Sequence, residues 1–212
     1  MAQILKIERL PRASGRVLIE LDDGTRIGLE KETAGDLKLC ADGEFDPDEL
    51  TARDYEREAS AAFNRALTML DRRARTRAQI RSDLEGRLFL PEAVDAAIEK
   101  LEHYRFVDDE DYAKRYASDK QHLSGYGRRR IQMGLRQIGI EEETAQKVIS
   151  ELDPELNEQA LEREAEKAVR RVAGQPYAAA RAKAGQALAR RGFSWEEIDR
   201  VLRRKLRQNE EE

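Results

Sequence analysis

Three consecutive arginines, Arg128 to Arg130, follow a Gly-Tyr-Gly sequence at residues 125–127 and open a segment with helical periodicity. Cations at the N-terminus of a helix oppose its dipole, so this position requires a compensating interaction. Guanidinium groups, together with free amides at a helix start, are well suited to bind anions. Two explanations stay open. The arginines hold an acidic or phosphate-bearing partner, or the acidic run at residues 108–111 neutralises them within the protein.

Basic residues recur in two other segments whose pattern matches the helix that begins at Arg128. We predict that the whole set binds a partner protein or DNA: Arg72, Arg73, Arg75, Arg77, Arg81, Tyr126, Arg128, Arg129, Arg130, Arg136, Arg181, Lys183, Arg190 and Arg191. Phosphate contacts of this kind would supply affinity without base specificity. Tyr126 and Tyr177 lie beside the basic runs, where an aromatic ring either stacks on a base or packs in the core.

No constellation of catalytic residues can be assembled from the sequence. His103 and His122 are the only histidines and have no nucleophile nearby, and no phosphate-binding loop or hydrolase motif occurs. Cys40 is the single cysteine and has no neighbour at metal-ligand spacing. The acidic run at residues 108–111 is predicted to cap a helix, because consecutive helical side chains diverge and cannot all face one metal ion. We expect no enzymatic activity, no cofactor and no metal.

The composition favours a folded, mostly helical chain with a thin core. Among 212 residues, 39 are basic and 43 acidic, and aromatic residues make up 6%. Net charge alternates along the chain: +4 over residues 60–90, −6 over 91–112, +6 over 113–140, −8 over 141–166 and +9 over 167–207. Either neighbouring helices pair these charges, or basic faces meet an acidic partner. With one cysteine and neither a signal peptide nor a long apolar stretch, a cytoplasmic monomer without membrane contact is expected.

The first 45 residues have the pattern of a small antiparallel sheet. Alternating or β-branched runs predict strands near residues 3–9, 15–21 and 25–30, with an Asp-Gly turn at residues 23–24. A short helix is expected near residues 31–38. Three short strands are only marginally stable alone, so the sheet should pack against a helix.

From residue 46 onward the sequence repeats itself. Its apolar positions recur about 51 and then 53 residues later, as Ile80, Leu84 and Phe89, then Ile131, Leu135 and Ile140, then Ala184, Leu188 and Phe193. Each of these segments is preceded by a further helix, near residues 52–74, 108–123 and 155–173. The fold class is therefore predicted as mainly α, with three tandem three-helix repeats in an extended array and a small N-terminal antiparallel β-sheet. The expected domains are residues 1–45, 46–107, 108–153 and 154–212.

The ends of the predicted helices carry recognisable signals. Thr76 with Gln79, and Ser194 with Glu197, fit capping boxes. Gly139 and Gly192 fit left-handed C-terminal caps, but Leu88 occupies that position in the first repeat, for which the sequence offers no reason. Trp195 falls in the first turn of the last helix, where we predict that it packs between repeats.

Several of these residues resemble the central motif of the RecX family, in the same order along the chain: Phe106-Val107-Asp108-Asp109, Tyr112-Ala113, Tyr116, Gly125-Tyr126-Gly127, Ile131, Leu135 and Gly139-Ile140. The first repeat is similar to that family at Arg73 and at Arg75-Thr76. The third repeat is similar to it at Arg191-Gly192-Phe193, Ile198 and Val201-Leu202. Two positions depart from the pattern: Arg128 stands where the family often has proline, and Gln79 where it often has glutamate.

The resemblance implies a regulator of the RecA recombinase. Such a protein would bind the RecA filament on single-stranded DNA and damp its strand exchange and ATPase activity, within homologous recombination, DNA repair and the SOS response. Two alternatives remain from the residues themselves. One is a protein that binds DNA directly, without sequence preference and without a recombinase partner. The other is a helical scaffold that joins proteins through its acidic blocks.

Overall fold

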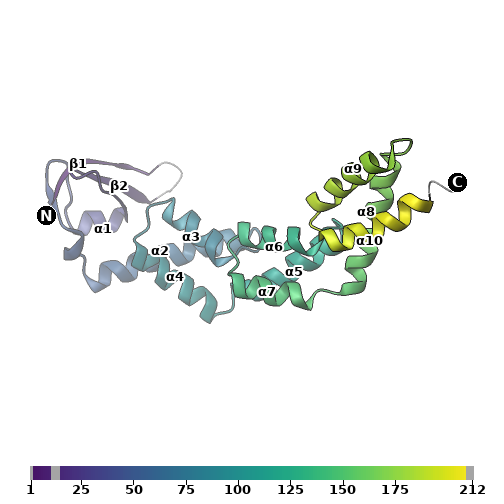
Figure 1. Cartoon of the computed structure of the whole chain (residues 1–212). Coiled ribbons are helices and arrows are strands. Elements are labelled where there is room, and N and C mark those ends of the chain that lie inside the picture. Colours follow the sequence, from purple (N-terminus) through teal and green to yellow (C-terminus); the bar gives the residue numbers. More distant parts are fainter. Residues whose placement is uncertain (1, 11–14, 209–212) are drawn as a thin grey trace. The chain divides into compact units, whose positions relative to one another are not determined.

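The structure is a computed structural model that describes residues 2–10 and 15–208. It is mainly helical, with an antiparallel sheet at the N-terminus, as the sequence predicts (Figure 1). The contacts within the chain divide it between Asp108 and Asp109 into two compact units. This one boundary lies between the first and the second three-helix sets. It separates neither the sheet from the first set nor the second set from the third, so the division into four domains stays a prediction.

The N-terminal sheet has four strands in the order β3-β2-β1-β4, all antiparallel. Strands β1 (Ala2–Arg9), β2 (Arg16–Leu21) and β3 (Arg26–Glu30) lie close to the predicted positions, and α1 (Lys31–Asp36) follows them. The turn between β2 and β3 forms as expected, with Gly24 at a φ of +85°. The two-residue strand β4 (Glu44–Phe45) was not predicted, because two residues are too short to show an alternating pattern.

The first three-helix set consists of α2 (Ala52–Leu70), α3 (Arg77–Glu85) and α4 (Pro91–His103), and a short 3-10 turn (Pro47–Glu49) precedes it. A full capping box begins α2, in which Thr51 and Asp54 each satisfy the other's backbone amide. The Thr76 hydroxyl accepts a hydrogen bond from the Gln79 amide at the start of α3, which is one of the two hydrogen bonds of the predicted capping box. Buried apolar side chains from all three helices form one core.

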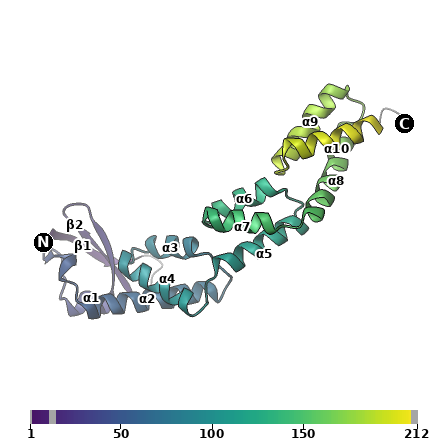
Figure 2. The ribbon, with the colours of Figure 1, turned by 60° about the horizontal axis from the view of Figure 1, so that its bottom comes forward.

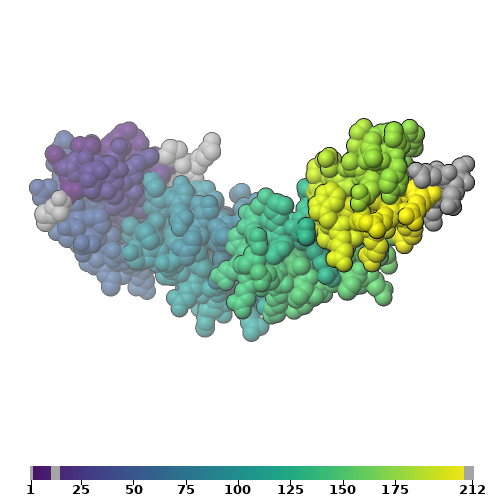
Figure 3. Space-filling view, in the orientation of Figure 1, coloured from purple at the N-terminus to yellow at the C-terminus, as the bar shows by residue number. Residues whose placement is uncertain are grey.

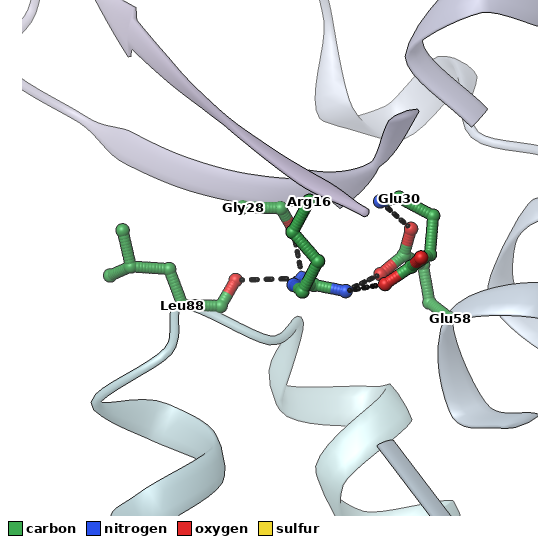
Figure 4. A network of polar contacts seen from close by, with 5 residues as sticks. All are labelled: Arg16, Gly28, Glu30, Glu58 and Leu88. Atoms are coloured by element: carbon green, nitrogen blue, oxygen red, sulfur yellow. Dashed lines mark hydrogen bonds and ion pairs between the residues drawn. The ribbon is translucent and has the colours of Figure 1, made fainter. Parts of the chain in front are cut away.

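The sheet and the first three-helix set also share a core and a buried ionic network. Leu90 and Ala93 of the first three-helix set pack among the apolar side chains of the sheet. The guanidinium of Arg16, which is 4% exposed, donates to Glu30 at 2.8 Å, to the fully buried Glu58 at 2.7 Å and to the Gly28 carbonyl at 2.6 Å (Figure 4). One cation therefore joins the sheet to α2.

The same network explains the left-handed residue Leu88, which has a φ of +58°. Its carbonyl accepts a hydrogen bond from the Gly28 amide at 3.0 Å and faces the Arg16 guanidinium at 3.4 Å. A side chain at position 28 would lie 2.7 Å from that carbonyl oxygen, so only glycine permits this approach. The strained backbone at Leu88 thus turns a carbonyl toward β3 and ties the first repeat to the sheet.

Replacing Glu30 with Gln is expected to leave the first unit as stable as before, or more stable, at pH 7. Burial raises the pKa of Glu30, and the nearby Glu58 opposes the lowering effect of Arg16. A carboxyl group whose pKa is raised on folding binds its proton more tightly in the folded state, so ionising it costs stability as the pH rises through that pKa. The advantage of E30Q should shrink as the pH falls toward the group's unfolded pKa. Urea denaturation of both proteins at several pH values measures this, and a large loss of stability in E30Q at pH 7 would contradict it.

The second unit contains two further three-helix sets, which can be followed in Figure 2. Helices α5 (Asp109–His122), α6 (Arg128–Gln137) and α7 (Glu142–Glu151) form one, and α8 (Pro154–Arg170), α9 (Tyr177–Arg190) and α10 (Trp195–Gln208) form the other. Each set has its own core of buried apolar residues. The capping box of Ser194 and Glu197 is complete, and Gly139 and Gly192 have the predicted left-handed φ values of +82° and +92°.

Ion pairs within the second unit account for much of the charge alternation. The acidic face of α8 pairs with the basic face of α10, through Glu158 with Arg200, Glu162 with Arg204 and Lys205, and Glu166 with Lys205. Exposed pairs of this kind stabilise a fold by about 0–1 kcal/mol each. Their main effect is to neutralise two helices of opposite charge, as one of the two explanations of the charge pattern predicts.

The prediction that Trp195 packs between repeats is wrong. Its side chain lies against Gly185 of α9, within the same three-helix set, and 57% of the residue is exposed. The sequence shows a lone aromatic residue in an amphipathic helix, which usually packs in a core. Only the structure shows that Trp195 stands at the edge of that core, beyond the buried Ile198.

Candidate arginine-lined binding site

The start of α6 joins the second repeat to the third through the backbone. The amide of Gly127 donates to the Arg191 carbonyl at 2.9 Å, and the amide of Arg129 donates to the Gly192 carbonyl at 3.1 Å. A side chain at Gly127 would lie 2.6 Å from the carbonyl carbon of Gly192, so the two backbones can meet only at glycines. The amides of Gly127 and Arg129 therefore already donate to backbone carbonyls and are not free to bind an anion. For these two amides, the prediction of an anion site at the helix start is wrong.

Two of the arginines that open α6 donate hydrogen bonds to carbonyls at the C-terminal ends of other helices. Arg128 donates to the Leu152 carbonyl, at the end of α7, and Arg130 donates to the Arg190 carbonyl, at the end of α9. Cations are favourable at helix C-termini, so the interaction with α7 and α9 compensates for the unfavourable dipole of α6. Neither explanation offered by the sequence included this one. Glu110 of the acidic run pairs with Lys114 and Lys147 instead.

A cavity of about 380 Å³ lies beside this junction, within the second unit. It is lined by Tyr126, Arg130, Glu164, Ala168, Arg171, Ala187, Leu188, Arg190 and Arg191. These residues come from the turn before α6, from α6 itself and from the C-terminal halves of α8 and α9. Four of them, Tyr126, Arg130, Arg190 and Arg191, belong to the set predicted from the sequence. We call this cavity the arginine pocket.

Four arginines face a single carboxylate in the arginine pocket. Glu164 is only 12% exposed at its side chain and pairs with Arg191 at 3.2 Å and with Lys167 at 2.7 Å. Within the part of the chain that the structure describes, the side chains of Arg171 and Arg190 have no hydrogen-bond or ion-pair partner. Both stand at helix C-termini, where the dipoles stabilise the positive charge. The pocket therefore has an excess of donors and positive charge, which suits a carboxylate or phosphate group.

Tyr126 positions the arginines and does not offer a bare face to a base. Its half-buried ring packs on the core of the second repeat. The guanidinium of Arg130 lies 4.4 Å from the ring centroid, and that of Arg191 lies 5.7 Å from it. Such cation–π contacts contribute about 0.5–1 kcal/mol at exposed sites. The arrangement favours the packing role that the sequence left open for this residue.

The other predicted residues lie elsewhere. Some form ion pairs: Arg77 with Glu102, Arg81 with Asp95, Arg136 with Glu142 and Arg181 with Asp199. The side chains of Arg72, Arg73, Arg129 and Lys183 are exposed and have no such partner among the described residues. Arg75 is half-buried, and its Nε atom lacks a hydrogen-bond partner within the described residues.

Sequence reasoning missed Arg171 and Glu164, which line the arginine pocket from α8. Arg171 does fall in the strongly basic segment of residues 167–207, but only the packing of α8 against α9 shows that it faces the same cavity as Arg190. No group of three or more His, Cys, Asp and Glu side chains within residues 2–10 and 15–208 could hold a metal ion. Nor is any helix in those ranges long and apolar enough to cross a lipid bilayer.

Comparison with protein-family models identifies the three helical repeats. The first three-helix domain of RecX matches residues 62–101, the second matches residues 108–149 and the third matches residues 157–202. Together these matches cover more than half of the chain. The chain belongs to the RecX family. The family resemblance that the sequence indicates is therefore confirmed.

Similar RecX proteins extend the match to nearly the whole chain. The regulatory protein RecX of Levilactobacillus brevis is 30% identical over 194 residues, which are 91% of this chain and 72% of the relative. That of Leuconostoc mesenteroides is 27% identical over all of this chain and 79% of its own length. A crystal structure of regulatory protein RecX covers 95% of this chain and 98% of that one, at 27% identity and a TM-score of 0.66. RecX proteins are regulatory proteins, in agreement with the expected lack of enzymatic activity.

Proposed function

We propose that this protein is a cytoplasmic, monomeric regulator of the RecA recombinase. It binds the RecA filament on single-stranded DNA and inhibits its ATPase and strand-exchange activity during homologous recombination, DNA repair and the SOS response. The arginine pocket is the observation that carries the proposal. The side chains of Arg171 and Arg190 line it without a partner among the described residues, so both can pair with an acidic group. Membership of the RecX family supports the choice of recombinase as the partner.

The pocket suits an acidic group on a macromolecule better than a small metabolite. Its lining has no histidine, cysteine or hydroxyl nucleophile besides the Tyr126 phenol, so it offers charge and hydrogen bonds but no catalytic group. Guanidinium groups pair with both phosphates and carboxylates, and these contacts fix position without reading base sequence. A regulator that acts on filaments of any DNA sequence needs contacts of this kind.

Binding to preformed filaments tests the proposal. Fluorescence anisotropy would compare the affinity of this protein for RecA filaments assembled on labelled poly(dT) with its affinity for poly(dT) alone. We expect the filament to be preferred. A steeply salt-dependent affinity for bare DNA, with no further gain when RecA is present, would instead favour direct DNA binding without a recombinase partner.

Neutralising the two unpaired arginines, in the variant R171Q/R190Q, is expected to weaken filament binding at least tenfold. A hydrogen bond to a charged group contributes about 1.5–3 kcal/mol, and a factor of ten corresponds to about 1.4 kcal/mol. Glutamine avoids placing a negative charge at a helix C-terminus, so the fold should be unaffected. The matched control is R163Q, which changes an exposed arginine of α8 outside the pocket. Equal binding by the two variants would remove the arginine pocket from the proposed function.

A further inference from the structure

A second concave surface lies between α9 and α10, on the third repeat. It is a cavity of about 230 Å³ lined by Tyr177, Ala178, Arg181, Ala182, Trp195, Ile198, Asp199 and Leu202. Ile198 and Leu202 are each only 1% exposed and form its floor. On the α9 side the lining includes Ala178 and Ala182, whose short side chains leave the cavity open. Figure 3 shows the surfaces of α9, in light green, and of α10, in yellow, side by side and uncovered. We call this surface the aromatic groove.

Trp195 is held in place yet left largely exposed. A side chain at Gly185 would lie 3.0 Å from Cζ3 of the indole, so the glycine makes room for the ring to lie against α9. Glycine within a helix costs about 1 kcal/mol relative to alanine. In α9 this cost falls at Gly185, the position against which the indole packs. Even so, 57% of Trp195 is exposed to solvent. A fixed, exposed tryptophan is the residue type most enriched among energetic hot spots of protein interfaces.

The two aromatic residues stand at opposite ends of the aromatic groove. Tyr177 begins α9, and Trp195 lies beside Gly185, eight residues further along that helix. At 1.5 Å per residue the two ends are about 12 Å apart, which equals roughly two turns of an α-helix. Tyr177 is itself 37% exposed. The apolar floor between them therefore has the length for two or three apolar side chains of one bound segment.

The rim of the aromatic groove carries a small net positive charge. Asp199 accepts hydrogen bonds from Arg181 and, at 2.6 Å, from Arg203. The bond from Arg181 is the main cause that lowers the pKa of Asp199, so this carboxylate pairs with the two arginines as an anion. Two cations share this one acid, which leaves one positive charge in excess at the rim. An acidic residue beside the apolar side chains of a protein partner would complement this rim.

We propose that the aromatic groove binds a protein segment that presents apolar side chains over about two helical turns, flanked by an acidic residue. The inference rests on the proposed function, since the partner we assign is the protein component of the filament. It adds a second contact, apolar in character, to the charged contact at the arginine pocket. The two surfaces use different parts of α9, so each can be altered without changing the other.

The single tryptophan makes the aromatic groove directly observable. The protein would be produced with 5-fluorotryptophan, which gives one ¹⁹F resonance, from position 195. Unlabelled RecA filaments on poly(dT) would then be added, and sedimentation of the same samples would report how much protein is bound. The spectrum of the bound protein would be recorded under magic-angle spinning on the sedimented filament, because slow tumbling would broaden any filament-bound resonance in solution. We expect the resonance to shift on filament binding and to stay unchanged with poly(dT) alone.

Two variants add an energetic test. W195A and Y177A are each expected to weaken filament binding at least tenfold, whereas L123A, which changes a leucine that is 83% exposed outside the groove, should bind normally. The ¹⁹F measurement uses the unaltered groove and so keeps the proposal testable if W195A fails to fold.

Each other outcome overturns the inference in a different way. An unchanged resonance on a protein that sediments with the filament would reject the groove and leave the proposed function intact. A shift with poly(dT) alone would show that Trp195 stacks on bases. A shift that depends only on the concentration of this protein would assign the groove to a second copy of the chain. No binding to the filament at all would reject the proposed function and this inference together.

Discussion

Replacing Arg16 with Met is expected to destabilise the first unit by about 3–5 kcal/mol. The guanidinium is the only cation in contact with the buried Glu58 among the described residues, and it also pairs with Glu30 and lies 3.6 Å from the centroid of the Phe89 ring. Removing one partner of a buried ion pair leaves an uncompensated charge, which is the origin of this cost. Methionine keeps much of the volume, so the loss reports charge more than packing. Urea denaturation followed by circular dichroism would measure it.

Two further variants test whether the stability lost in R16M comes from the buried charge of Glu58. R26M changes an exposed arginine on the neighbouring strand β3 and should cost little. The double variant R16M/E58Q should recover part of the loss. Its carboxamide oxygen can still accept the hydrogen bond that the Glu30 amide donates to Glu58, and the side chain then carries no charge. A cost below about 1 kcal/mol for R16M would show that the network is not buried as the structure describes.

Replacing Gly192 with Ala is expected to disrupt the junction between the second and third repeats, with a loss of about 2–5 kcal/mol in the stability of the second unit. Its φ of +92° costs an L-residue about 1–2 kcal/mol. The added methyl would also lie within 3 Å of the Arg130 Cα, and overpacking of this kind costs about 1–3 kcal/mol. Trp195 lies in the same unit, so urea denaturation followed by its fluorescence reports the effect.

Gly174 provides a matched control for that junction. It has a similar φ of +77° in the same unit, but an added methyl would have no neighbour within 4 Å. G174A should therefore show the backbone cost alone, about 1–2 kcal/mol. If G192A and G174A lose the same stability, the close contact between Gly192 and α6 contributes nothing.

The repeats could be predicted because their signals are local. Periodic apolar positions such as Ile80, Ile131 and Ala184 indicate helices whatever surrounds them, and caps such as Ser194 with Glu197 mark their ends. The resemblance to the RecX family rests on some of the same residues. The structure gives two of them, Gly127 and Gly192, a physical reason: they let two backbones meet at the junction between repeats.

The features that escaped prediction depend on contacts distant in sequence. Leucine is an unfavourable residue for a left-handed helix cap, and nothing near Leu88 in the sequence explains it. The explanation is the hydrogen bond that its carbonyl accepts from the amide of Gly28, sixty residues earlier. The arginines that open α6 oppose its dipole, and only the structure shows Arg128 and Arg130 at the ends of α7 and α9. Arg171 joins the arginine pocket only through the packing of α8. In each case the local pattern is ambiguous, and a partner from another element decides it.

Regulation of RecA by this protein can be measured as the ATPase activity of RecA on single-stranded DNA while this protein is added in increasing amounts. We expect inhibition at amounts well below one molecule of this protein per RecA subunit. We also expect that at least tenfold more of the R171Q/R190Q variant is needed for the same inhibition, while R163Q behaves as the unaltered protein. An ATPase rate that stays constant up to equimolar amounts, under conditions where RecA alone is active, would contradict this expectation.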